Sequence, residues 1–400
     1  MDSDTIGPVN PVDNPYRPGA GRRPPLLAGR ASLLDNFEVV QTRAEVRGEG
    51  DRSWVLNGLR GVGKTVLLGE LFARATARQW IAAKVEVGAG GPLPAALSRA
   101  LTASMRRATG HHPAPRIRRL LGVLKGFSLR VDPTGAFAVG VDVDAIRGIA
   151  DTGRLGDDLS GLLEVMSETA RDLGIGVLIL IDELQEAPEE SLAAINTAVH
   201  HLGQLDPAPP VLFVGAGLPS LPAQLADATS YAERLYEYRN VGLLDPGAAR
   251  EALVVPARDL EVEWNPDALE TALDVARGYP YFLQAIGKHV WDAARTDVID
   301  ADDVEVGLEA ARQAVDDGLY RSRWERATPA QRDVMRALAR LGGEEPAPVA
   351  DIAVAAGKTR TSDISVARVE LIKKGLVYAP ERGLLAFTVP GMHDFVARQN

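Results

Sequence analysis

Residues 58–65, GLRGVGKT, place two outer glycines, a lysine and a threonine at the spacing G-x-x-x-x-G-K-[ST]. The apolar run WVLN precedes this segment and the run TVLLGELFARA follows it, as expected for a strand, a loop and a helix. Glycines let backbone N–H groups curve around a phosphate, and the first turn of a helix adds its positive dipole end. The alternative is a glycine loop with no ligand, but both flanking segments favour phosphate binding.

The loop therefore predicts a nucleotide triphosphate, ATP, as the ligand. Lys64 is expected to reach the β- and γ-phosphates, and the Thr65 hydroxyl to ligate Mg²⁺. The residues expected to line the phosphates are Gly58, Leu59, Arg60, Gly61, Val62, Gly63, Lys64, Thr65 and Val66.

An apolar segment that ends in two acids supplies the second half of such a site. Residues 176–183 read GVLILIDE, which is typical of a buried central strand. Ligands of parallel sheets bind at the carboxyl ends of the strands, where Asp182 is expected to hold Mg²⁺ and Glu183 to act as general base. In the alternative, Asp182 only caps the next helix. Asp182 alone would permit binding, whereas Glu183 permits hydrolysis.

The elements around these motifs indicate an α/β fold. Strand-like runs (SWVLN, IAAKVEV, VLILI and PVLFVG) alternate with helical ones between residue 53 and about residue 220. This alternation predicts a P-loop NTPase fold, a doubly wound parallel sheet with helices on both faces. Residues 125–143, KGFSLRVDPTGAFAVGVDV, alternate around a DPTG turn, which predicts a β-hairpin inserted in the sheet domain.

We expect four regions along the chain. Residues 1–25 are proline-rich and predict an extended arm, and residues 26–240 form the nucleotide domain. Residues 241–324 predict an α-helical lid. Residues 325–400 show three helical segments and then two short strands, the order of a winged helix-turn-helix.

Composition narrows the class of protein further. The 400 residues are 46% hydrophobic and 24% charged, with a formal net charge of −10, so the chain as a whole is not a general polyanion binder. The absence of cysteine excludes disulfides and cysteine nucleophiles and is compatible with a reducing cytoplasm. No apolar stretch approaches the ~18 residues that a membrane helix needs, so we expect a cytoplasmic protein without a membrane partner.

The set GLRGVGKT, LILIDELQ, VLFVGAGLPSLP, SYAERLYEY and GYPYFLQ resembles the AAA+/STAND-type P-loop ATPases, in particular archaeal-type ATPases and origin-recognition initiator-like ATPases. The resemblance implies that Gly29 and Arg30 line the adenine pocket; otherwise LLAGR is only a helix lead-in. It also places the sensor for the γ-phosphate at Gly215-Ala216-Gly217, which offers no side-chain donor, so we expect slow hydrolysis.

The resemblance implies three further assignments. Arg234 lies where related proteins place an arginine finger, which would act from a neighbouring subunit of a homo-oligomer; Arg239 is a rival, and a surface pair of Arg234 with Glu237 is the alternative. Tyr279 and Pro280 match the G-x-P motif of STAND ATPases, which lies over the nucleotide. The helix that follows lacks a sensor arginine, which favours a switch over a motor.

The C-terminal region carries the candidates for nucleic-acid binding. These are Lys358, Arg360, Arg368, Lys373 and Lys374, and residues 325–400 hold 11 Lys and Arg against 9 Asp and Glu. Residues 88–131 contain no acid and form a second basic stretch, either a phosphate-binding surface or a solvated helix face. We therefore expect a Mg-ATP-dependent switch that contacts double-stranded DNA through its winged helix. The alternatives are a signalling switch that binds a protein partner and a nucleotide binder without hydrolysis.

Overall fold

The computed structural model describes residues 9–88, 91–109, 114–131, 144–343 and 345–399. The chain divides into two compact units. The sheet unit comprises residues 32–58 and 64–240, and the helical unit comprises residues 1–31, 59–63 and 241–400. The tip of the phosphate loop, residues 59–63, thus groups with the helical unit, whereas Gly58 and Lys64 group with the sheet unit.

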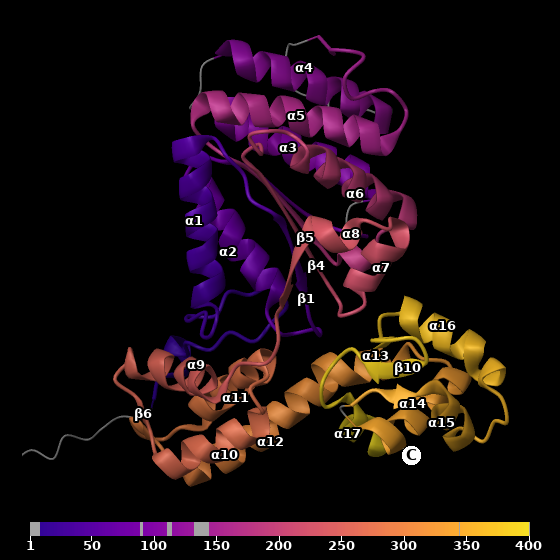
Figure 1. Cartoon of the computed structure of the whole chain (residues 1–400). Coiled ribbons are helices and arrows are strands. Elements are labelled where there is room, and N and C mark those ends of the chain that lie inside the picture. Colours follow the sequence, from indigo (N-terminus) through magenta and orange to yellow (C-terminus); the bar gives the residue numbers. More distant parts are fainter. Residues whose placement is uncertain (1–8, 89–90, 110–113, 132–143, 344, 400) are drawn as a thin grey trace, which may run out of the picture. The chain divides into compact units, whose positions relative to one another are not determined.

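The sheet unit is built on five parallel strands in the order β2-β3-β4-β1-β5 (Figure 1). The strands are β1 (Ser53–Asn57), β2 (Ile81–Glu86), β3 (Val177–Asp182), β4 (Val211–Gly217) and β5 (Tyr236–Asn240). Every residue of β3 and β4 is buried, which explains their continuous apolar sequence. The predicted parallel α/β sheet is confirmed, and β5 adds an edge strand that the sequence pattern did not indicate.

Helices cover the sheet on both faces. In Figure 1 the strands run between α1 and α2 on one side and α6, α7 and α8 on the other. The helices of this unit are α1 (Ala31–Arg47), α2 (Lys64–Ala77), α3 (Leu93–Thr109), α4 (Ala114–Val131), α5 (Leu155–Leu173), α6 (Glu189–Gly203), α7 (Leu221–Ala228) and α8 (Ala232–Leu235). A short 3₁₀ turn, η2 (Leu184–Glu186), follows β3 directly.

The predicted β-hairpin at 125–143 is wrong in its first half. Residues 125–131 are the last turns of α4, and residues 132–143 lie outside the described residues. Ile117, Leu120, Leu124 and Phe127 are all buried at helical spacing. The segment is helical because these side chains form one continuous buried stripe along α4. Alternation over residues 125–131 alone is too short to distinguish a strand from a helix.

The lid part of the helical unit is made of α9 (Pro246–Arg258), α10 (Pro266–Ala276), α11 (Pro280–Ala293), α12 (Ala301–Val315) and α13 (Ser322–Glu325), with the short parallel pair β6 (Glu263–Trp264) and β7 (Val298–Ile299). Between α12 and α13 the chain forms one π-helical segment, η3 (Asp316–Arg321).

The N-terminal arm packs on the lid. A 3₁₀ turn, η1 (Pro11–Asp13), precedes Tyr16, whose hydroxyl donates a hydrogen bond to the Leu253 carbonyl of α9. The Trp291 indole of α11 donates to the Asn10 carbonyl at 3.1 Å. The described part of the arm is therefore attached to α9 and α11 of the lid.

The C-terminal domain follows the order helix, strand, helix, 3₁₀ turn, helix, strand, strand, helix. Its elements are α14 (Pro329–Gly342), β8 (Ala347–Pro348), α15 (Val349–Ala355), η4 (Thr361–Ile364), α16 (Ser365–Lys373), β9 (Val377–Tyr378), β10 (Leu384–Phe387) and α17 (Met392–Ala397). Strand β10 pairs antiparallel with both β8 and β9. The three helices and the strand pair lie where the sequence placed them; the winged-helix assignment stays a prediction.

None of the helices in the described part of the chain combines the length and the apolar character that a membrane span requires.

Candidate nucleotide site

The carboxyl ends of three neighbouring strands define the site. Strand β4 lies between β1 and β3, with Asn57 opposite Gly217 on one side and Ile181 opposite Gly215 on the other. The phosphate loop leaves β1 and the acid pair leaves β3 at this same edge of the sheet. The parallel register thus brings together motifs that are about 120 residues apart in the sequence.

The phosphate loop has the backbone that its glycines predict. Gly61 and Gly63 have φ angles of 81° and 100°, a region that side chains disfavour. Lys64 opens α2, is only 6% exposed, and its Nζ donates a hydrogen bond to the Gly58 carbonyl at 2.8 Å. The Gly58 N–H in turn donates to the Gly217 carbonyl at 3.1 Å, which fixes the start of the loop to the end of β4.

The acid pair consists of two carboxylates in different environments. Asp182 is only 2% exposed, and its Oδ1 accepts the Glu183 N–H at 3.0 Å. A buried carboxylate is costly unless a cation or several donors compensate it. The carboxylate of Asp182 and the hydroxyl of Thr65 are hard oxygen donors of the kind that Mg²⁺ prefers, so these residues fit the ion. Mg²⁺ would neutralise charge on the phosphates there.

Glu183 is less buried than Asp182 and has an unusual backbone. Its φ and ψ angles are 51° and 36°, the left-handed region that a non-glycine residue seldom adopts. Its Oε2 accepts a hydrogen bond from Gln185 Nε2 at 2.7 Å. Gln185 Oε1 accepts the Leu218 N–H at 3.1 Å, just beyond β4. The sequence pattern did not single out Gln185, although it lies two residues after the acid pair.

The tip of the phosphate loop is held from both sides within the helical unit. The Arg60 N–H donates to the Thr388 carbonyl of the C-terminal domain at 3.1 Å. The Arg60 carbonyl accepts a hydrogen bond from the Tyr279 hydroxyl of the lid. A Cβ at Gly61 would collide with that hydroxyl, so the glycine is also needed for this contact. Burial raises the pKa of Tyr279 well above its ordinary value of 10.0 and keeps the hydroxyl a donor.

Tyr279 and Pro280 begin helix α11. Tyr279 is the N-cap residue and Pro280 the first helical residue, a position that suits its missing N–H. Gly278, with φ 70°, has its Cβ position blocked by the Leu244 carbonyl, so glycine is required there. The predicted lid motif therefore reaches the phosphate loop through the Tyr279 hydroxyl.

Arg30 contacts the same loop at Val62. Its Nη2 donates to the Val62 carbonyl at 3.2 Å and to the Gly242 carbonyl at 2.6 Å. Burial lowers the pKa of the Arg30 guanidinium, and the nearby Asp245 carboxylate opposes that shift. Gly29 adopts φ 66° beside Ala248 of α9. The adenine assignment of Gly29 and Arg30 stays a prediction.

The two candidate finger arginines differ in environment. Arg234 lies on α8 and is exposed. Glu237 pairs with Arg239 at 3.0 Å, not with Arg234. The Arg239 guanidinium stacks over the Trp54 ring, 3.7 Å from its centroid, which occupies it within its own unit. Of the two, Arg234 has the exposure that a residue acting on a neighbouring subunit needs.

The five basic candidates of the C-terminal domain differ in their exposure and in their partners. Lys358 and Arg360 are exposed. Lys374 Nζ donates to the Arg326 carbonyl at 2.7 Å and to Gln331 at 2.8 Å, and Lys373 pairs with Glu370 at 2.9 Å. Arg368 is partly buried.

Helix α16 holds two of the basic candidates, Arg368 and the exposed Lys373, but it also exposes apolar side chains. Val366 is 77% exposed, and Val369 and Ile372 follow on the same side of the helix. Val354 of α15, 69% exposed, is another exposed apolar side chain of this domain.

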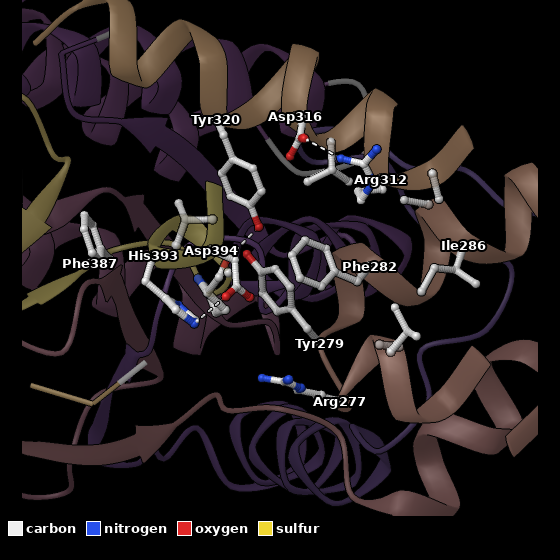
Figure 2. Close-up of a pocket in the computed structure, with 18 of the residues that line it drawn as sticks. Arg277, Tyr279, Phe282, Ile286, Arg312, Asp316, Tyr320, Phe387, His393 and Asp394 are labelled. Carbon is white, nitrogen blue, oxygen red and sulfur yellow. Dashed lines mark hydrogen bonds and ion pairs between the residues drawn. The ribbon is translucent and has the colours of Figure 1, made fainter. Parts of the chain in front are cut away.

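A cavity of about 540 Å³ lies within the helical unit, between the lid and the C-terminal domain. Figure 2 shows the rings of Tyr279, Phe282 and Tyr320 at its centre, with Arg312 paired to Asp316 on its wall. Asp316 accepts hydrogen bonds from Arg312 at 3.3 Å and from Arg398 at 2.8 Å. Tyr279, whose hydroxyl contacts the phosphate loop, thus also lines this cavity.

The phosphate loop, the acid pair and the parallel sheet together define a class, the P-loop ATPases. Residues 27–214 match the family of AAA ATPase domains, which confirms the expected AAA+ P-loop ATPase; the STAND-type character and the winged helix stay predictions. Residues 317–396 match a domain family of unknown function, DUF8462. No curated protein is recognisably similar to the chain in sequence.

Solved structures resemble this chain over most of its length, and two of them are a Walker-type ATPase and an ORC protein. A Walker-type ATPase of Pyrococcus abyssi shares 16% identity, with 95% of this chain and 98% of that chain covered at a TM-score of 0.57. The ORC2 protein of Aeropyrum pernix, in its ADP form, shares 14% identity over 94% and 96% of the two chains, at a TM-score of 0.51. At these identities the likeness concerns the fold.

Proposed function

We propose that this ATPase is a nucleotide-operated switch that binds Mg-ATP, hydrolyses it slowly and passes the nucleotide state to its C-terminal domain. The observation that carries this proposal is the pair of contacts at Arg60. Its N–H is bonded to Thr388 of the C-terminal domain and its carbonyl to Tyr279 of the lid. A phosphate that reshapes the loop therefore acts on both.

The room for such a movement supports the proposal. Close-packed interiors resist small displacements, and a shift of one side chain needs space on its far side. The cavity bordered by Tyr279, Phe282 and Tyr320 provides that space. Nucleotide would favour one of two arrangements of the loop tip, as a ligand shifts a population toward the state it binds better.

The absence of a polar side chain at the end of β4 supports slow hydrolysis. The segment Gly215-Ala216-Gly217 brings no polar side chain toward the γ-phosphate. Electrostatic stabilisation of the transition state by one donor is worth about 10²–10³ in rate where it has been removed. We therefore assign Lys64 to phosphate binding, Asp182 and Thr65 to Mg²⁺, and Glu183 to the activation of water.

Two variants test the switch. Lys64→Ala removes the charge at the β- and γ-phosphates, and we expect it to abolish tight ATP binding in calorimetry. Glu183→Gln keeps the shape of the side chain without its basicity, and we expect normal ATP binding with phosphate release reduced at least about 100-fold. Parental turnover by Glu183→Gln would show that another group activates water.

For the output of the switch, the surface of α16 favours a protein partner over duplex DNA. Val366, Val369 and Ile372 are exposed apolar side chains on it, next to the exposed Lys373, which pairs with Glu370 of the same helix; Lys374 is bonded to Arg326 and Gln331 within the domain. A helix that reads DNA normally presents basic or amide side chains to phosphates and base edges. DNA remains the second candidate, supported by the exposed Lys358 and Arg360.

A salt titration separates these outputs. Duplex binding through several phosphate contacts falls steeply as salt rises, with a slope of about −0.9 per contact on logarithmic axes. We expect the affinity for duplex DNA to be weak at about 150 mM salt and to stay unchanged in Val366→Ser. A steep slope that Lys358→Ala and Arg360→Ala flatten would instead favour DNA.

A further inference from the structure

The side chain of Gln185 connects Glu183, the proposed general base, to the end of β4. Gln185, in the 3₁₀ turn after β3, donates from Nε2 to Glu183 Oε2 at 2.7 Å. Its Oε1 accepts the Leu218 N–H at 3.1 Å. The residue therefore links two strand ends that are neighbours in the sheet but about 30 residues apart in the chain.

The chemistry of its partners fixes how this amide is oriented. The Leu218 N–H can only donate, and an ionised Glu183 carboxylate can only accept. The amide oxygen must therefore face Leu218, and the amide nitrogen must face Glu183. A flipped amide would place oxygen against carboxylate and N–H against N–H, so both hydrogen bonds hold the same arrangement.

Gly217 makes room for this amide. A Cβ at residue 217 would lie 2.5 Å from Gln185 Oε1 and 2.8 Å from Leu221 Cδ2, so the Gln185 amide would have to move away. The glycine at the end of β4 thus leaves the Gln185 amide in the position where a side chain of residue 217 would begin. The Gly217 carbonyl also accepts the Gly58 N–H, so the same residue contacts the phosphate loop.

The backbone of Glu183 needs such a support. Left-handed φ and ψ angles cost a non-glycine residue about 1–3 kcal/mol and persist only where the surroundings hold them. The donation from Gln185 restrains the Glu183 side chain in this conformation, and the bond to Leu218 restrains Gln185.

We propose that Gln185 is a positioning residue for hydrolysis, which holds the Glu183 carboxylate and ties it to the end of β4 beside the phosphate loop. The inference rests on the proposed role of Glu183. Water attacks the γ-phosphorus, the bond to the ADP oxygen breaks, and Glu183 takes the proton that the water loses. Gln185 acts only through Glu183 and exchanges no proton.

A nearly isosteric variant removes the donated bond and adds a negative charge beside Glu183 and Glu186, a charge that Gln185→Ala does not add. Gln185→Glu keeps an acceptor for the Leu218 N–H but, once ionised at pH 8, has no hydrogen to donate to Glu183. We expect kcat to fall about 10-fold or more, the size of effect typical of a misplaced acid–base group, while KM for ATP and affinity for Mg-ADP change less than about threefold. Gln185→Ala should show the same split between kcat and KM.

Gln204→Glu is the matched control, because it makes the same charge change at the exposed end of α6. It should keep the parental kcat. In a Glu183→Gln background, Gln185→Glu should add no further loss, since a residue that acts through another has no effect once the other is removed.

The outcomes distinguish the role of Gln185 from the role of Glu183. Parental turnover by Gln185→Glu, alongside an inactive Glu183→Gln, overturns the role of Gln185 and leaves the switch intact. A parental rate in Glu183→Gln overturns both. A loss of Mg-ADP affinity equal to the loss of kcat would show that Gln185 maintains the fold of the site and does not position the base.

Discussion

At the scale of single residues, the burial of Asp182 has a measurable consequence. Asp182→Asn keeps the size of the side chain and removes its charge, so we expect the Mg²⁺-dependent part of ATP affinity to be lost. Calorimetry with ATP in Mg²⁺ and in EDTA gives this difference directly. Glu190→Gln, an exposed carboxylate in the first turn of α6, is the control. An undiminished Mg²⁺ effect in Asp182→Asn would assign the ion to other ligands.

Local sequence was sufficient to find some site residues and not others. Lys64, Thr65 and the acid pair follow from motif spacing, because each motif lies on one loop beside one strand. Gln185 could not be found in this way. Its role depends on the pairing of β3 with β4, and its neighbours Gly217 and Leu218 identify it only once the sheet is formed.

At the scale of elements, the contact between helix α11 and the phosphate loop can be tested alone. Tyr279→Phe keeps the ring, which packs at 4.5 Å against Phe282, and removes the hydroxyl that bonds to Arg60. Losing one such hydrogen bond costs about 0.5–1.5 kcal/mol in the free energy of unfolding. We expect this loss without nucleotide, measured by denaturant titration, and a smaller one in Tyr281→Phe. Equal values for both variants would mean that the hydroxyl contributes nothing specific.

Periodicity in the sequence was sufficient to predict the buried strands, but not the edge strand or the end of α4. Strands β1, β2, β3 and β4 were predicted because buried parallel strands are apolar throughout. Strand β5, YEYRN, was missed since an edge strand carries polar residues. The segment 125–131 was misassigned because seven residues fit both periods, and burial along the whole of α4 decides between them.

At the scale of the whole molecule, four buried tyrosines predict sensitivity to alkaline pH. Burial raises the pKa of Tyr16, Tyr236, Tyr279 and Tyr320 above the ordinary value of 10.0. The unfolded chain ionises near pH 10 while the folded chain stays neutral. Stability is therefore complete below pH 10 and falls as the pH rises through and above it.

The slope of this loss identifies its source. Each tyrosine that ionises only on unfolding contributes about 1.4 kcal/mol per pH unit. Unfolding free energies measured from pH 9 to 11.5 should therefore fall less steeply for Tyr320→Phe than for the parent, by that amount. An identical slope would place the ionisation of Tyr320 at its ordinary value in the folded protein.

The contact between Arg60 and Thr388 involves only main-chain atoms, N–H on one side and C=O on the other. An alanine scan of the loop and of the C-terminal domain would leave both groups in place and miss the connection entirely. Only a change to the peptide unit itself, such as proline at position 60 or an ester in place of that amide, can cut it. The hydrogen bond is for that reason insensitive to the chemical identity of either side chain and tolerant of sequence drift at both positions.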